Sequence, residues 1–113
     1  MLSIQTFIDL AMSFPGTEQK PHFDRIAFKV AGRRIFATLH EPTATCNIKL
    51  KVVDQETFCA FEGGGIYPVA NKWGQQGWTT FELKKVPQEL IAEALYTAYS
   101  VVVPNKNSGA SND

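Results

Sequence analysis

The stretch KWGQQGWTTFEL, residues 72–83, holds both tryptophans of the chain together with two glycines and an adjacent glutamine pair. A tryptophan needs a partner for its N–H and room for a large ring, so two of them so close together mark an organised segment. Gly74 and Gly77 bracket the glutamines, which predicts a tight turn between the tryptophans. We expect this turn to be fixed against a sheet, with at least one of Trp73 and Trp78 largely buried.

Length and composition indicate one globular domain. The chain has 113 residues, of which 44% are hydrophobic, too few for two cores and too apolar for a disordered chain. Eleven basic and eleven acidic residues cancel, which argues against a protein that coats nucleic acid through bulk positive charge. Residues 20–51, however, carry seven basic and two acidic residues, so the middle third has a net charge of +5.

Nothing in the sequence predicts export or membrane insertion. The N-terminal segment MLSIQTFIDLAMSF has no basic region, and Asp9 interrupts its apolar run. No apolar stretch approaches the length of a membrane span. Cys46 and Cys59 match no metal-binding spacing, and we expect both thiols to be reduced and unpaired. We therefore expect a cytoplasmic protein that does not contact a membrane.

Hydrophobic periodicity predicts helices and strands in a mixed order. Helices are predicted over 4–12, 55–61 and 87–102, with Ser3 and Asp54 as N-caps of the first two. Strands are predicted over 18–23, 25–31, 34–40, 45–52 and 78–83, with a hairpin turn at Gly32, and residues 66–72 form an extended or irregular connection. Pro21 predicts that the first strand is an edge strand. The predicted domain is 1–104, and the polar segment 105–113 is predicted to be a disordered tail.

The number of helices decides the predicted fold class. Each of the three main helices has one apolar face, so together they cover one face of a sheet. The short connections between strands favour an antiparallel meander. We predict an α+β two-layer sandwich with one partly open sheet face. The predicted core is the set Phe28, Ile35, Leu39, Ile48, Leu50, Phe81, Ile91 and Leu95.

The open face is the candidate binding surface. Strict alternation along the strands places cations and two aromatic rings on it, and cations attract phosphates while exposed rings stack on bases. The candidate nucleic-acid-binding residues are Arg25, Lys29, Arg34, Phe36, Lys49, Lys51 and Trp78. The alternative is an ordinary solvated sheet face, on which Phe36 and Trp78 pack under a loop or form a self-association patch.

Other features give little support for catalysis. His22 and His40 lack the spacing of metal ligands, and the glycines at 63–65 neither follow a strand nor open a helix, as a phosphate-binding loop would. Neither cysteine has an evident base beside it. No arrangement of nucleophile, base and acid is evident in the sequence, although such groups converge in space and not along the chain. We expect no catalytic residue, cofactor or metal.

Two blocks of the sequence resemble the MmcQ/YjbR-like family of small bacterial proteins. They are KPHFDRIAFKVAGRRIFATL at 20–39 and KWGQQGWTTFEL at 72–83, and SFPGTEQ at 13–19 and IKLKV at 48–52 fit the same pattern. The resemblance implies a two-layer fold with an antiparallel sheet and a DNA-binding role through a double-wing arrangement. It implies no catalytic activity and no cofactor, and it attaches no established role to any single residue.

Three functions remain open from the sequence. The first is weak binding of DNA or another polyanion through the basic strand face. The second is a protein-interaction module whose open face self-associates or docks on a partner. The third is a small-molecule pocket between the tryptophan turn and the strand that carries Arg25.

Overall fold

The computed structural model describes residues 2–103; the predicted tail, 105–113, lies outside the described residues. The predicted helices and strands are present with shifted ends, and the structure adds a short helix where a tight turn was predicted and a short strand within the predicted irregular connection. The helices are α1 (Ile4–Met12), α2 (Val52–Cys59), α3 (Lys72–Gln75) and α4 (Gln88–Val102), with a 3-10 turn η1 (Glu41–Thr43). The strands are β1 (Thr17–His22), β2 (Arg25–Val30), β3 (Ile35–His40), β4 (Thr45–Lys49), β5 (Ile66–Pro68) and β6 (Trp78–Glu82).

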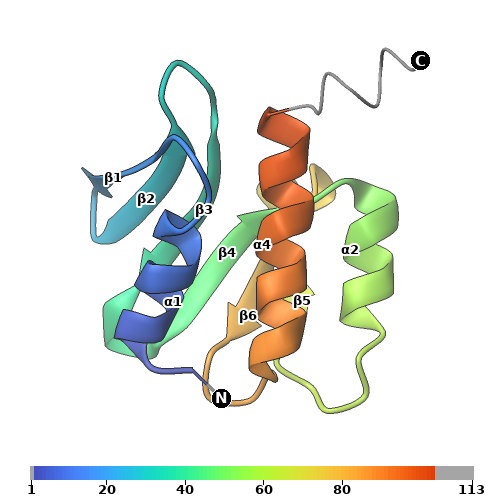
Figure 1. The fold of residues 1–113 in the computed structure, drawn as a ribbon. Helices are drawn as coiled ribbons and strands as arrows, with labels where there is room; N and C mark the ends of the chain where they lie inside the picture. Colours follow the sequence, from blue (N-terminus) through green and yellow to red (C-terminus); the bar gives the residue numbers. More distant parts are fainter. Residues whose placement is uncertain (1, 104–113) are drawn as a thin grey trace.

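All six strands form one antiparallel sheet in the order β1-β2-β3-β4-β6-β5. The first four strands are a meander, and β1, which contains Pro21, is an edge strand as predicted. The helices α1, α2 and α4 lie on the same side of the sheet (Figure 1). Ring contacts between Phe7 and Phe28 and between Phe58 and Phe81 join α1 and α2 to that side. The predicted α+β two-layer fold is confirmed.

The helix ends show where local signals decided the structure and where they did not. Ser3 caps α1 as predicted, because its Oγ accepts a hydrogen bond from the Thr6 N–H at 3.0 Å. The prediction that Asp54 caps the second helix is wrong: α2 begins at Val52, with Lys51 as an extended N-cap that makes no side-chain cap. The strand before it accordingly ends at Lys49 and not at Val52.

A β-bulge at Phe36 changes which residues of β3 face the helices. Phe28 pairs with Ala37, but the next residue of β2, Lys29, pairs with Ile35, so Phe36 is the extra residue. Phe36 is fully buried and packs edge-on against Tyr99 of α4, with ring centroids 5.8 Å apart. The predicted place of Phe36 on the open face is therefore wrong. Ile35, predicted in the core, is half-buried on a surface groove instead.

The rest of the predicted core is confirmed. Seven residues of the predicted set are buried in one apolar cluster beneath the helices: Phe28, Leu39, Ile48, Leu50, Phe81, Ile91 and Leu95. A deletion in such a cluster removes transfer free energy and leaves a cavity, so the cluster provides the main stabilisation of the domain.

The tryptophan stretch is held by its glycines and not by its indole rings. Trp73 is 50% exposed, whereas most of Trp78 is buried, which agrees with the expectation that one of the two residues is largely buried. Gly74 and Gly77 are buried, and a Cβ on them would lie 1.9 Å from the carbonyl oxygen of Val69 and 1.8 Å from that of Leu50. The backbone at both positions therefore packs directly on a neighbouring segment, which only glycine allows.

Candidate functional site

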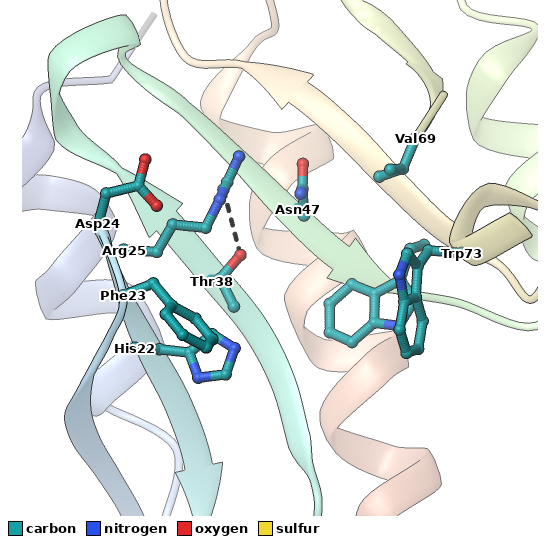
Figure 2. Close-up of a pocket in the computed structure, with 9 residues that line it drawn as sticks. His22, Phe23, Asp24, Arg25, Thr38, Asn47, Val69 and Trp73 are labelled. Carbon is teal, nitrogen blue, oxygen red and sulfur yellow. Dashed lines mark hydrogen bonds between the residues drawn. The ribbon is translucent and has the colours of Figure 1, made fainter. Parts of the chain in front are cut away.

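The open face of the sheet holds a groove of about 430 Å³, a volume within the range of small-ligand sites, about 300–1,000 Å³. Its residues come from the β1–β2 turn, the middle strands and the tryptophan stretch. They are His22, Phe23, Asp24, Arg25, Thr38, Asn47, Val69, Trp73 and Trp78. Figure 2 shows Phe23 and Arg25 on one side of the groove and Trp73 on the other. The groove thus lies between the tryptophan turn and the Arg25 strand, where the third sequence hypothesis placed a pocket.

Phe23 forms one wall in an unfavourable conformation. His22 pairs with Arg25, so Phe23 and Asp24 are the two-residue turn of the β1–β2 hairpin. Phe23 has a φ of +59°, which a bulky side chain rarely adopts, and it is 95% exposed. Such a backbone conformation costs of order 1–3 kcal/mol, and the exposed ring recovers no burial energy. Neither the turn nor the core requires a phenylalanine here, which points to a role in binding.

A chain of hydrogen bonds fixes the turn that carries Phe23. Asp24 Oδ2 lies 3.0 Å from His40 Nε2, and His40 Nδ1 lies 2.7 Å from the Thr43 hydroxyl. Thr43 in turn contacts the Thr45 hydroxyl at 2.9 Å. These contacts join the tip of the β1–β2 hairpin to η1 and the start of β4. They restrict the orientation of the hairpin relative to the sheet.

The acid, imidazole and hydroxyl of Asp24, His40 and Thr43 occur in the order of a catalytic triad, which the sequence did not reveal. The Thr43 hydroxyl, however, does not line the groove, and it also contacts Thr45. The position that a nucleophile would need is thus away from the groove where a substrate could bind. We therefore interpret the hydrogen bonds that join Asp24, His40 and Thr43 as structural. Among residues 2–103 no group of three or more His, Cys, Asp or Glu side chains could hold a metal ion.

Polar side chains from the central strands form the floor of the groove. Thr38, Asn47 and Thr80 are register partners across β3, β4 and β6. The Thr80 hydroxyl donates to Asn47 Oδ1 at 2.7 Å, which leaves the Asn47 amide N–H groups facing away from that bond. Arg25 donates from Nη1 to the Thr38 hydroxyl at 3.2 Å. The floor therefore presents amide and guanidinium donors beside aromatic walls.

The opposite wall rests on a buried glutamine. Gln55 of α2 donates from Nε2 to the carbonyl oxygen of Gly74 at 2.9 Å and to that of Trp78 at 3.2 Å. Trp73 lies in the first turn of the short helix α3, and its N–H donates to the Oδ1 of the N-cap Asn71 at 2.8 Å. The backbone on both sides of the turn is thus anchored from the helix layer, while the rings of Trp73 and Trp78 lie on the groove side.

A second groove of about 430 Å³ continues the first, because Trp73 and Trp78 line both. It adds the cations Arg33, Arg34 and Lys49, together with Ile35, Gln76 and three apolar residues of α4, Ala98, Val101 and Val102. Burial and the nearby charge of Arg34 lower the pKa of Lys49. Within residues 2–103, no carboxylate forms a salt bridge with Arg25, Arg34 or Lys49. The charges of Arg34 and Lys49 repel each other, so an anion bound between them would be stabilised.

The cations near α4 also have a purely structural explanation. Arg33 and Arg34 line a hollow with Val101 and Val102 at the C-terminal end of that helix, where the helix dipole favours positive charge. This accounts for the two arginines without a ligand. It does not account for Lys49 or for the exposed rings of Phe23 and Trp73.

The structure brings together only part of the predicted site. Arg25 and Trp78 line the first groove, and Arg34, Lys49 and Trp78 line the second. Lys29 lines neither groove, but it is the register partner of Ile35, which lines the second. Phe36 is in the core, and Lys51 lines a hollow with Tyr96 and Thr97 of α4 on the helix side. The placement of Lys51 on the open face is wrong because the strand ends two residues earlier.

Sequence reasoning missed the residues that complete the walls. Trp73 and Val69 lie on a short helix and a loop, where strand alternation makes no prediction. Phe23 was predicted at the end of the first strand, but that strand ends at His22 and Phe23 lies in the turn. The one available signal was a phenylalanine between His22 and Asp24 in a two-residue turn, a position that normally favours glycine or asparagine.

Comparisons with known proteins give a family and a fold. The model of the YjbR family matches residues 12–101, and a search of curated proteins gave no match. A crystal structure of the Deinococcus radiodurans protein DR2400, with a DUF419 domain, is similar with a TM-score of 0.77 and 20% identity, covering 99% of this chain and 88% of that one. A Pseudomonas syringae protein is similar with a TM-score of 0.68 and 16% identity, covering 89% and 99%. These identities show a shared fold alone.

Proposed function

Because the chain belongs to the YjbR family and its open sheet face has an aromatic-walled groove that continues into a groove lined by cations, we propose that it is a non-catalytic module that binds nucleic acid. The family resemblance seen in the sequence is confirmed. The DNA-binding role that the resemblance implies is part of this proposal, as is a cytoplasmic location. Among residues 2–103, none of the helices has the length and apolar character needed to cross a bilayer.

One observation carries the proposal: Arg34 and Lys49 line one groove with two tryptophans, and neither cation has a carboxylate salt-bridge partner among the described residues. Cations held together at the surface are what a phosphate backbone requires. The overall neutral charge and the acidic side chain of Glu82, which is bonded to Tyr67 and Lys85, limit the affinity. We expect micromolar or weaker binding at physiological salt with little dependence on base sequence.

A salt titration with a short duplex tests this proposal. Four candidate phosphate contacts remain after the structure removes Lys51: Arg25, Lys29, Arg34 and Lys49. If all four contact phosphates, log affinity falls with log salt with a slope of about −3 to −4, since each contact contributes about −0.9 on duplex DNA. Absence of binding at low salt to any nucleic acid would contradict the proposed function.

Two lysines give a matched pair of variants. Lys49→Gln removes a cation from the groove, so we expect weaker binding and a slope reduced by about one. Lys51→Gln removes the same charge two residues away on the helix side, so we expect affinity and slope close to those of the parent protein. Equal losses of affinity in the two variants would show that binding depends on the net charge of the protein and not on the position of Lys49.

The second candidate function is self-association through the same face. The exposure of Trp73 and Phe23 favours it, since large apolar side chains at a surface often mark protein interfaces. Sedimentation analysis of the parent protein and Phe23→Ser distinguishes the two functions, because self-association through the groove would be lost in the variant without any nucleic acid present.

A further inference from the structure

We infer that the groove between Phe23 and Trp73 accepts an unpaired nucleobase, so that this chain prefers single-stranded to double-stranded nucleic acid. The inference rests on the proposed function and adds to it the structural class of the ligand. It depends on three features of the groove: its walls, its floor and its connection to the cations.

The walls have the chemistry that stacks on a base. Phe23 and Trp73 lie on opposite sides of the groove (Figure 2) and are 95% and 50% exposed. Rings that flank a single-stranded path bind base faces without reading sequence, because every base has such a face. In a duplex the same faces are covered by the neighbouring base pairs. A paired base therefore cannot enter the space between these walls.

The floor has donors for the edge of a base. The Asn47 amide group is oriented by the Thr80 hydroxyl at 2.7 Å, and Arg25 is oriented by the Thr38 hydroxyl at 3.2 Å. Asn47 lies on β4 and Arg25 on β2, the two strands that flank β3, so their backbone positions are set by the sheet and not by a loop. A base can accept hydrogen bonds here through its carbonyl or ring-nitrogen acceptors, and an unpaired base also has the acceptors of its pairing edge free.

The sugar–phosphate backbone of a bound single-stranded nucleic acid has a path from the first groove to the cations of the second. Trp73 and Trp78 line both grooves, so a base beside them places its neighbouring phosphate toward Arg34 and Lys49. Asp24, the acidic residue of the first groove, is bonded to His40 and not to Arg25. Arg25 therefore keeps its charge available to a ligand.

The strained turn supports the same conclusion. Phe23 has a φ of +59°, and burial of its ring does not offset the cost of this backbone conformation. The contact of Asp24 with His40 holds the turn beside the groove. This places a ring at the groove before any ligand is present. Pre-positioning of this kind reduces the ordering cost of binding.

The test compares three ligands of equal length, about ten nucleotides, which is within the site sizes of small single-strand-binding domains. They are an oligothymidylate, an abasic strand with the same phosphates, and a duplex. Tryptophan fluorescence and anisotropy report binding at low salt. We expect the oligothymidylate to bind roughly 5- to 140-fold more tightly than the abasic strand, the range that one stacked base contributes.

Two variants locate the effect. Phe23→Ser and Trp73→Ser should reduce oligothymidylate affinity by a similar factor and leave abasic affinity unchanged, while both keep the circular dichroism spectrum and unfolding midpoint of the parent. Val53→Ser, at an exposed position on the helix side, is the control and should change neither affinity.

The outcomes separate the inference from the proposed function. If the duplex and the abasic strand bind as tightly as the oligothymidylate, or if both groove variants bind it normally, the inference is wrong while nucleic-acid binding stands. If no ligand binds at low salt, the proposed function itself fails. Binding of the oligothymidylate that is lost in Lys49→Gln but not in Phe23→Ser would also overturn the inference.

Discussion

Gln55 Nε2 donates a hydrogen bond to the carbonyl oxygen of Gly74 at 2.9 Å, which joins helix α2 to the turn between the two tryptophans. The same nitrogen lies 3.2 Å from the carbonyl oxygen of Trp78 and 3.1 Å from the Thr79 hydroxyl. A buried side chain on the helix side of the sheet thus positions the backbone whose indole rings line the groove on the other side.

Replacement of Gln55 by methionine should destabilise the domain. The change keeps the side-chain volume but removes the donor to three oxygens, so we expect the free energy of unfolding to fall by about 1–3 kcal/mol. Gln75→Met, at an exposed position in the same stretch, should change it by less than about 0.5 kcal/mol. Urea denaturation measures both, and equal effects would contradict the role assigned to Gln55.

Gly77→Ala should cost more than the strain of its backbone alone. The new Cβ would lie 1.8 Å from the carbonyl oxygen of Leu50, and Gly77 also has a φ of +107°. Gly64→Ala has a φ of +80° but no atom within 4 Å of the new Cβ, so it measures strain without a clash. We expect Gly77→Ala to lose at least about 1–3 kcal/mol more than Gly64→Ala, the cost typical of overpacking. Similar losses in thermal unfolding would show that the close packing is unimportant.

Phe23→Gly should separate stability from binding. Glycine adopts a positive φ without steric cost, so the variant should be as stable as the parent or more stable by up to about 1 kcal/mol. The same variant should bind single strands less tightly, since it lacks the ring. Ala44→Gly, at the other non-glycine position with positive φ, should show the stability effect without the binding effect. A clear loss of stability in Phe23→Gly would mean that the ring packs in a way the structure does not show.

Leu95→Ala should be among the most destabilising single changes in α4. Leu95 is fully buried in the core, so we expect a loss of about 2–5 kcal/mol. Leu90→Ala is the same substitution in the same helix at a half-buried position, and its cost should be clearly smaller. A loss below about 0.5 kcal/mol for Leu95→Ala in urea denaturation would contradict the packing of α4 on the sheet.

The two thiols should react slowly in the folded protein. Burial raises the pKa of Cys46 and, to a lesser extent, that of half-buried Cys59. A raised pKa leaves less thiolate at a given pH, so modification should speed up only well above pH 8.5, the usual pKa of a free thiol. A thiol reagent should label Cys46 only after unfolding, with Cys46→Ala and Cys59→Ala assigning the signals. Rapid labelling of native Cys46, or a Cys46–Cys59 disulfide without oxidant, would refute this.

Periodicity was sufficient for the strands but not for their irregularities. Alternation correctly placed Phe28, Leu39 and Ile48 toward the helices because each is in a regular part of its strand. It misplaced Ile35 and Phe36 because one extra residue in β3 reverses the alternation. A bulge depends on how two strands pair, and neither strand alone carries the information.

The sequence by itself determined the fold class, most helix and strand positions and the identity of the basic strands, because these follow from local periodicity, caps and turn residues. Only the tertiary structure decided the candidate groove. Its walls are Phe23, from a hairpin turn, and Trp73, from a short helix some fifty residues later in the chain. Lys51 does not lie on the open face because β4 ends at Lys49, and Phe36 does not because β3 contains a bulge. Such outcomes depend on contacts between segments distant in the chain, and a local pattern does not record those contacts.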